Sequence, residues 1–281
     1  MPATATIGSL RVGDDAKPLL IAGPCVIESE DLALSIADSI ARLPVTREFN
    51  FVFKASYTKD NRSAGESFRG VGLDAGLRVL ENVRSKIGCP VLSDVHTPDE
   101  VPAAAAVLDV VQIPAFLCRQ TSLLEAAGAS GKAINVKKGQ FLAPDDMGNV
   151  VTKLRAAGAR DIILTERGTS FGYHDLVVDF RGFARMRATG CPVVFDVTHS
   201  LQRPGGLGTA SGGEPALAAM MARAAAAVPV DGFFIETHPE PKKALSDAAS
   251  MLPLDQLETL LRDVSRIATL AHELSNGRVS P

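Results

Sequence analysis

The sequence predicts an α/β protein, a (β/α)8 TIM barrel with a short N-terminal β-hairpin, and the barrel occupies residues 1–281 as a single domain. Three observations support this fold class. Eight short apolar runs rich in Val, Ile, Leu and Phe recur along the chain, and longer segments with helical spacing lie between them. The runs are continuously apolar rather than alternating, which is typical of parallel strands buried on both faces. The length of 281 residues also suits this fold, which usually needs about 250 residues.

The elements follow one another in a regular order. The first dozen residues have turn signals at Gly8 and Gly13 and predict the hairpin, which we expect to close the bottom of the barrel. The expected strands are LLIAG from Leu19, FVFKA from Phe51, PVLSDV from Pro90, DVVQI from Asp109, AINV from Ala133, DIILT from Asp161, PVVFDV from Pro192 and DGFFIE from Asp231. Helices are expected over residues 30–42, 74–87, 98–107, 119–129, 147–157, 214–227 and 254–274. Several of them begin at Pro, Asp or Ser and end at Gly.

Composition excludes several classes of protein. The chain has 32 acidic residues against 29 Lys and Arg, so its net charge of −3 gives no overall attraction to nucleic acid. No apolar run approaches the roughly 20 residues that cross a bilayer, and the first 20 residues lack a basic stretch followed by an apolar core. The four cysteines are widely spaced, as reduced thiols of a cytoplasmic protein would be. We therefore expect a cytoplasmic protein without a membrane or nucleic-acid partner.

Long polar connections follow several of the expected strands, at 56–72, 169–190 and 237–251. Loops after the strands form the active face of a barrel, so this face is the expected place for chemistry. Cationic residues gather at the same strand ends: Lys54, Lys59, Arg62, Lys137, Lys138 and Arg167. Such charges repel one another unless anions fill the site, which predicts a ligand with a phosphate or carboxylate group. Strand alternation points Lys137 inward, whereas Lys138 taken alone is better interpreted as a solvated surface charge.

A second group of residues at the strand exits could bind a metal ion. Cys25, His199, Glu236 and Asp247 follow the first, seventh and eighth strands. A thiolate, an imidazole and two carboxylates suit one divalent ion such as Fe(II), Zn(II), Mn(II) or Cd(II). His96 and His238 are alternative imidazole ligands that the spacing does not exclude. A lone Cys25 would more often be a buried apolar thiol.

Several acids and bases lie near the strand ends as well. Proton transfer could involve Asp94, His96, Asp196, Glu166 or Glu236. Asp196 and Glu166 could equally be partners that hold the Lys and Arg side chains, and the sequence does not rank these residues.

Eight ordered motifs resemble one known family. GPC, KASYTKDNRS, SDVHTP, QIPAFLCRQT, NVKKGQF, TERGTSFGY, DVTHSLQRPGG and FIETHPEPKKALSDA, between about residues 21 and 254, closely resemble 3-deoxy-D-manno-octulosonate 8-phosphate synthase (KDO8P synthase). The resemblance implies a (β/α)8 barrel, usually a homotetramer. It also implies a transferase of lipopolysaccharide biosynthesis that condenses phosphoenolpyruvate with D-arabinose 5-phosphate and releases inorganic phosphate.

The resemblance also assigns roles to residues. It implies that phosphoenolpyruvate is held by Lys54, Ser56, Lys59, Gln112, Lys137 and Arg167, with Lys137 and Arg167 at its phosphate. Asn61, Arg62 and Ser63 would bind the acceptor sugar phosphate, with Arg119 from a neighbouring subunit. The catalytic residues would be Lys59, Asp94, His96, Lys137 and His199. The family's metal-free branch has Asn after the GP pair, so Cys25, with His199, Glu236 and Asp247, indicates the metal-dependent branch. One departure is Ala64, where many members have a second Ser.

Two other functions remain open at this point. The related DAHP synthases use erythrose 4-phosphate and typically have a KPRTS-like run in the loop after the second strand, whereas this chain has KDNRS at residues 59–63. That difference favours arabinose 5-phosphate as the acceptor. A barrel that binds sugar phosphates without catalysis is the alternative from another class, and it would release no phosphate.

Overall fold

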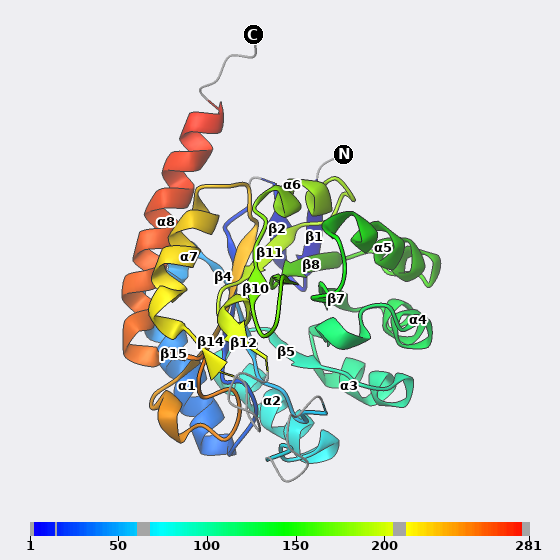
Figure 1. The fold of residues 1–281 in the computed structure, drawn as a ribbon. Helices are drawn as coiled ribbons and strands as arrows, with labels where there is room; N and C mark the ends of the chain where they lie inside the picture. Colours follow the sequence, from blue (N-terminus) through cyan, green and yellow to red (C-terminus); the bar gives the residue numbers. More distant parts are fainter. Residues whose placement is uncertain (1–2, 15, 61–67, 205–211, 277–281) are drawn as a thin grey trace.

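A computed structural model describes residues 3–14, 16–60, 68–204 and 212–276, and its centre is a closed barrel of eight parallel strands (Figure 1). Each strand pairs with the next in sequence, and β14 pairs with both β11 and β3, which closes the cylinder. All eight expected strands are confirmed, although the last one extends two residues beyond the expected run. They are β3 (Leu19–Gly23), β4 (Asn50–Lys54), β5 (Val91–Asp94), β6 (Val110–Ile113), β7 (Ala133–Lys137), β8 (Ile162–Glu166), β11 (Val193–Asp196) and β14 (Gly232–His238).

Helices surround this barrel on the outside (Figure 1). They are α1 (Glu30–Arg42), α2 (Leu73–Ile87), α3 (Val101–Val107), α4 (Thr121–Ala129), α5 (Met147–Ala156), α6 (Arg181–Arg187), α7 (Ala218–Ala226) and α8 (Leu254–Asn276). The expected helices are confirmed, with α3, α4 and α7 beginning two to four residues later than expected. Short 3-10 turns occupy the expected first residues of α3 and α7. Helix α6 was not expected from the sequence. It has seven residues, too few for a helical period to be visible, and only Phe183 and Met186 are its large buried side chains.

Short additional strands lie in the loops that follow the barrel strands. They are β9 (Thr169–Ser170) with β10 (Leu176–Val177), β12 (Gln202–Arg203) with β13 (Gly212–Gly213), and β15 (Leu252–Pro253) beside the end of β14. Within the described residues, no helix is both long enough and apolar enough to cross a bilayer.

The expected N-terminal hairpin is present and consists of β1 (Thr4–Ile7) and β2 (Leu10–Gly13). Its buried side chains Ile7 and Val12 join the apolar cluster inside the barrel. The amide of Thr6 donates to Asp161 Oδ1 at 2.7 Å, and Asp161 directly precedes β8. The hairpin therefore lies at the amino ends of the strands and closes that end, which leaves the carboxyl ends as the open face.

The barrel interior is apolar through its middle. Strand β3 contributes two residues to this apolar layer and each of the other barrel strands contributes one. They are Leu19, Ile21, Val52, Leu92, Val110, Ala133, Ile163, Val194 and Phe234. Because side chains alternate along a strand, the next inward position lies two residues further on, toward the open face. At those positions the sequence changes from apolar to polar residues, and the candidate site begins there.

Candidate active site

A layer of polar side chains lies directly above the apolar interior. Counting two residues on from the interior residues gives Lys54, Asp94, Gln112, Asn135, Thr165, Asp196 and Glu236, all of them buried. One further step along the same faces gives Lys137 and Arg167. The strand alternation thus brings together residues from across the chain at one end of the barrel. The predicted residues Lys54, Asp94, Gln112, Lys137, Arg167 and Glu236 are all part of this layer or its rim.

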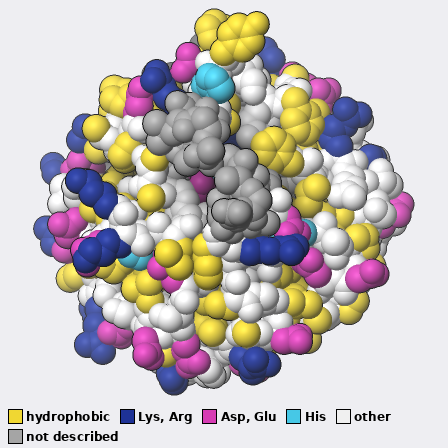
Figure 2. Space-filling model, turned by 60° about the horizontal axis from the view of Figure 1, so that its bottom comes forward, with side chains coloured by type: hydrophobic (Ala, Val, Ile, Leu, Met, Phe, Trp, Pro, Cys, Tyr) yellow, Lys and Arg dark blue, Asp and Glu magenta, His cyan; other side chains and the backbone are white. Residues whose placement is uncertain are grey.

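The cations of this layer are paired with carboxylates. Lys54 Nζ lies 2.5 Å from Glu236 Oε1, and Lys137 Nζ lies 2.6 Å from Asp196 Oδ2. Lys59 Nζ lies 3.6 Å from Asp94 Oδ2. Repulsion among these like charges is thus relieved within the protein itself, because each ammonium meets a carboxylate from another part of the chain, which sequence spacing did not show. On the side of the molecule that Figure 2 presents, Lys and Arg side chains are spread among Asp and Glu rather than gathered in one patch.

The pKa values of these carboxyl groups agree with the pairing. Burial raises the pKa of Glu236, but the charges of His199 and Lys54 outweigh it and lower the pKa to about 2. Burial also raises the pKa values of Asp94 and Asp196, but neighbouring cations hold both well below the usual range: Lys59 and Lys54 at Asp94, and His199 and Lys137 at Asp196. Burial lowers the pKa of Lys137, an effect that Asp196 opposes. The carboxyl groups are therefore ionised at neutral pH and act as charge partners.

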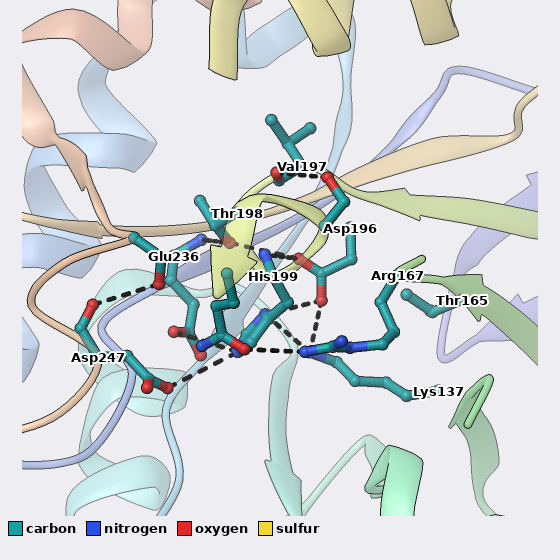
Figure 3. A network of polar contacts seen from close by, with 12 residues as sticks. Lys137, Thr165, Arg167, Asp196, Val197, Thr198, His199, Glu236 and Asp247 are labelled. Carbon is teal, nitrogen blue, oxygen red and sulfur yellow. Dashed lines mark hydrogen bonds and ion pairs between the residues drawn. The ribbon is translucent and has the colours of Figure 1, made fainter. Parts of the chain in front are cut away.

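His199 joins the cationic cluster to the predicted metal ligands (Figure 3). Its Nδ1 lies 2.8 Å from Asp196 Oδ2, and its Nε2 lies 3.5 Å from Glu236 Oε2 and 3.8 Å from Asp247 Oδ2. We assign the proton to Nδ1, because Asp196 is ionised and can only accept a hydrogen bond. Nε2 faces the two carboxylates and, in its unprotonated form, would ligate a metal ion held between them, as in a histidine that a carboxylate orients for a metal.

The metal-type donors themselves are close together. One donor atom each from Cys25, Glu236 and Asp247 lies within 4.8 Å of the others. Cys25 Sγ is 3.0 Å from Asp247 Oδ2, and Glu236 Oε2 is buried and has no hydrogen-bond partner within the part of the chain that the structure describes. Burial, and then the charges of Asp247 and Glu236, raise the pKa of the Cys25 thiol well above its usual value. A divalent cation would relieve both features, so the residues fit a metal ion.

The loop that holds Asp247 is fixed in an uncommon backbone conformation. Asp247 has φ of 48°, in the left-handed region that Asp tolerates better than most residues. The amide of Leu245 donates to Glu28 Oε1 at 3.0 Å, and the amide of Ser250 donates to the carbonyl of Asp247 at 3.0 Å. These contacts on both sides of Asp247 hold its carboxylate beside Cys25.

A continuous chain of four buried hydrogen bonds joins five residues at the carboxyl ends of five consecutive barrel strands, β4 to β8. Thr165 Oγ1 donates to Asn135 Oδ1 at 2.7 Å, and Asn135 Nδ2 donates to Gln112 Oε1 at 2.7 Å. Gln112 Nε2 donates to Asp94 Oδ1 at 2.6 Å, and Ser56 Oγ donates to Asp94 Oδ2 at 2.6 Å. All donors point toward Asp94, so the chain fixes the orientation of the Gln112 amide and of the Ser56 hydroxyl.

Arg167 is a buried cation with a free hydrogen-bond donor. Its side chain is 4% exposed, and Nη2 donates to Gln202 Oε1 at 2.8 Å. Nη1 is buried and has no partner among the described residues. Figure 3 shows Arg167 and Lys137 side by side, both directed toward His199. A buried guanidinium nitrogen without a partner is costly, and an anionic ligand would satisfy it.

The remaining predicted residues lie elsewhere or outside the described part. His96 is near Glu100, which accepts hydrogen bonds from the His96 amide and the Tyr57 hydroxyl, and no contact joins His96 to the metal-type donors in the described chain. His238 Nδ1 accepts from the amide of Glu240, so it is bound to its own loop. Arg119 is exposed in the connection after β6. Asn61, Arg62, Ser63 and Ala64 lie outside the described residues.

Sequence reasoning missed or misread several residues of the site. Lys138 is fully buried, not solvated, because carbonyl oxygens, Thr169 and Glu166 surround its ammonium. Asn135, Thr165 and Gln202 were not predicted at all. The inward alternation from Ala133 and Ile163 was a usable signal for Asn135 and Thr165, whereas nothing local marked Gln202.

Comparison with known proteins places the chain in a family. Residues 2–273 match the model of the DAHP synthetase I family. The chain belongs to this family. A protein of Desulfatibacillum aliphaticivorans named 2-dehydro-3-deoxyphosphooctonate aldolase is 54% identical over 272 residues, which cover 96% of this chain and 100% of that protein.

Two further relatives of this chain carry the same name. The protein of Syntrophotalea carbinolica is 53% identical, over 95% of this chain and 96% of its own length. That of Dechloromonas aromatica is 55% identical, over 89% of this chain and 91% of its own length. The name is a synonym of KDO8P synthase, so the resemblance stated from the motifs is confirmed.

Proposed function

We propose that this chain condenses phosphoenolpyruvate with D-arabinose 5-phosphate and water, giving 3-deoxy-D-manno-octulosonate 8-phosphate and inorganic phosphate for lipopolysaccharide precursor synthesis. The relatives' shared name supports this reaction. The observation that carries it in the geometry is His199, whose two ring nitrogens face the Lys137–Asp196 pair on one side and Glu236 and Asp247 on the other. An anionic substrate and a metal ion would therefore lie next to each other.

In this proposal, phosphoenolpyruvate lies across the polar layer. Lys137 and Arg167 bind its phosphate, and the free Nη1 of Arg167 supports that assignment. Lys54 and Lys59 face its carboxylate, while Ser56 and Gln112 fix its orientation. Because these groups are positioned before the substrate arrives, binding could supply a large part of the about 7–11 kcal/mol that orientation can contribute to a two-substrate reaction.

The reaction then proceeds in three changes of bonding. Carbon 3 of phosphoenolpyruvate attacks the aldehyde carbon of the sugar, and the aldehyde oxygen takes up a proton to become a hydroxyl. Water adds at carbon 2 and loses one proton, which balances the proton taken up at the aldehyde oxygen. The bond from carbon 2 to the phosphate oxygen then breaks, the new hydroxyl group gives its proton to the departing phosphate, and the products are the ketone and inorganic phosphate. Lys137 and Arg167 stabilise the negative charge of the leaving phosphate. Asp94, kept ionised, holds Lys59 and the Gln112 amide in place.

Cys25, His199, Glu236 and Asp247 would hold one divalent metal ion. Such an ion supplies Lewis-acid or orienting chemistry to an oxygen ligand. Asp196 keeps the Nδ1 proton of His199 in place and so keeps Nε2 available. The acceptor's phosphate is assigned to Asn61, Arg62 and Ser63, with Arg119 from a second copy. A homotetramer and a cytoplasmic location belong to the same proposal.

One assay tests the proposed function. Purified protein is incubated with phosphoenolpyruvate and either arabinose 5-phosphate or erythrose 4-phosphate, and release of inorganic phosphate is followed. We expect release with arabinose 5-phosphate. Release with erythrose 4-phosphate alone would indicate the DAHP reaction, and binding without release would indicate a non-catalytic barrel.

A further inference from the structure

Lys138 is a completely buried ammonium outside the set of residues assigned to substrate or metal. Its side chain has no exposed surface, although it follows β7 directly and lies beside Lys137 in the sequence. Five oxygen atoms surround Nζ: Thr169 Oγ1 at 2.9 Å, the carbonyls of Gly139 and Gly168 at 3.3 Å, the carbonyl of Leu142 at 3.4 Å, and Glu166 Oε1 at 3.3 Å. An ammonium has three hydrogens to donate, so each of them finds an acceptor here.

The carboxylate beside Lys138 organises the turn that presents Arg167. Glu166 Oε1 accepts hydrogen bonds from the amide of Arg167 at 2.9 Å and from the amide of Gly168 at 2.7 Å. Gly168 has φ of 93°, a conformation that favours glycine and turns the chain sharply. Three donors thus converge on one carboxylate oxygen whose side chain is 3% exposed. A buried carboxylate without a cation beside it is costly, and the Lys138 ammonium at 3.3 Å removes that cost.

We propose that Lys138 is a positioning residue for substrate phosphate. Through Glu166 and the carbonyl of Gly168, it fixes the turn at 166–168. This turn directs the Arg167 guanidinium into the mouth of the barrel, which is the space at the carboxyl ends of the strands above the polar layer. This inference rests on the proposed function, in which Arg167 binds the phosphate of phosphoenolpyruvate. Arg167 is then held at two points. Glu166 holds its backbone amide, and Gln202 holds Nη2, which leaves Nη1 for the ligand.

The surroundings of position 138 require a side chain that is positively charged and donates hydrogen bonds. A neutral side chain at position 138 would leave Glu166 charged without a cation and would leave the carbonyls of Gly139, Leu142 and Gly168 without their donor. The turn would relax to reach water or another donor. Lys137, which precedes it, points into the barrel and contacts Asp196, so the two neighbouring lysines act on opposite sides of β7.

Binding of inorganic phosphate tests the inference without turnover. The dissociation constant of phosphate is measured by calorimetry, and KM values for both substrates are measured where the variants are active. For Lys138→Met we expect the phosphate dissociation constant and the KM of phosphoenolpyruvate to rise about tenfold or more, and the KM of arabinose 5-phosphate to stay within about twofold. Leu261→Ala is the matched control, because Leu261 is fully buried in α8. It should lower the midpoint of thermal unfolding without changing phosphate binding.

Two further variants keep the test decisive if Lys138→Met fails to fold. Thr169→Val removes one acceptor of the ammonium and keeps all charges, and Glu166→Gln keeps an oxygen for the two amides but removes the charge. Each should raise the KM of phosphoenolpyruvate by about threefold and leave that of arabinose 5-phosphate unchanged. The inference is overturned if phosphate binding in the folded variants stays within about twofold of the unmodified protein, or if both KM values rise together. If the unmodified protein releases no phosphate from the two substrates, the proposed function fails, while phosphate binding still decides the role of Lys138.

Discussion

Replacing Asn135 with leucine should show how much the buried hydrogen-bond chain contributes. Asn135 joins Thr165 Oγ1 and Gln112 Oε1, each at 2.7 Å, and all three side chains are at most 1% exposed. Leucine has a similar shape but neither accepts nor donates, so it leaves two buried polar atoms without partners. Each such atom costs about 1–3 kcal/mol, and the free energy of unfolding should therefore fall by about 2–6 kcal/mol.

A second substitution separates the loss of hydrogen bonds from poor packing. In the Asn135→Leu protein, Thr165→Val removes one of the two unpaired groups and should restore about 1–3 kcal/mol, although the same change in the unmodified protein destabilises it. Urea denaturation with an unchanged slope measures both effects. Asn135→Leu should also raise the KM of phosphoenolpyruvate, because Gln112 is no longer held. A loss below about 1 kcal/mol for Asn135→Leu, or a further loss in the double variant, would refute this account of the chain.

Three further predictions concern other parts of the mouth. Lys54→Met should lower the free energy of unfolding by about 3–5 kcal/mol in urea, because it strands the buried carboxylate of Glu236. Chelation should abolish the release of inorganic phosphate, and adding a divalent metal ion should restore it. The Cys25→Asn variant should release phosphate without bound metal, since the Asn amide can donate a hydrogen bond to the carboxylate of Asp247. Burial raises the pKa of Glu100, but hydrogen bonds from His96 outweigh burial and lower it from 4.5 to about 2. Glu100 therefore stabilises the fold above about pH 4.5, and this contribution is lost as the pH falls toward 2. In Glu100→Gln, the fall of the unfolding free energy between these pH values should be smaller by at most about 2 kcal/mol. Unfolding free energies measured at several pH values check this.

Each of these predictions has a contrary result. Lys54→Met together with Glu236→Gln should recover stability relative to Lys54→Met, and a further loss would mean that packing rather than charge dominates. Full turnover of metal-stripped protein, or an unchanged metal content in Cys25→Asn, would contradict the metal assignment. For Glu100, an acid unfolding curve of Glu100→Gln parallel to that of the unmodified protein would show that this carboxyl group does not contribute in that range.

The fold could be predicted because the physical cause of each strand is local. Eight continuous apolar runs form eight strands buried on both faces, and every one of them was visible in the sequence. Helix α6 was not, since two buried side chains in seven residues leave no measurable period. The same reasoning explains the success with Lys137: strand alternation alone places it on the inward side, where it meets Asp196.

Lys138 shows where local reasoning ends. Alternation correctly turns its side chain away from that of Lys137, but the layer into which it points is not solvent. Glu166 and Thr169, about thirty residues later in the chain, fill that layer with oxygen atoms. Only the closed barrel brings the loops after β7 and β8 together. Cys25 and Asp247 are separated even further, by 222 residues, and they were linked by their positions after the first and eighth strands and by the resemblance.

The pairing of cations with carboxylates changes how the mouth should bind its substrates. If the ammonium groups of Lys54, Lys59 and Lys137 faced one another alone, the site would be strongly positive and substrate binding would depend on neutralising it. Instead each has a carboxylate within 3.6 Å, so the described part of the mouth is close to neutral before any ligand binds. Attraction of an anion must then come from the remaining N–H groups, foremost Nη1 of Arg167, which has no partner among residues 3–14, 16–60, 68–204 and 212–276. The carboxylates contribute by holding the ammonium groups in position, so that little reorganisation is needed when charge develops on the departing phosphate.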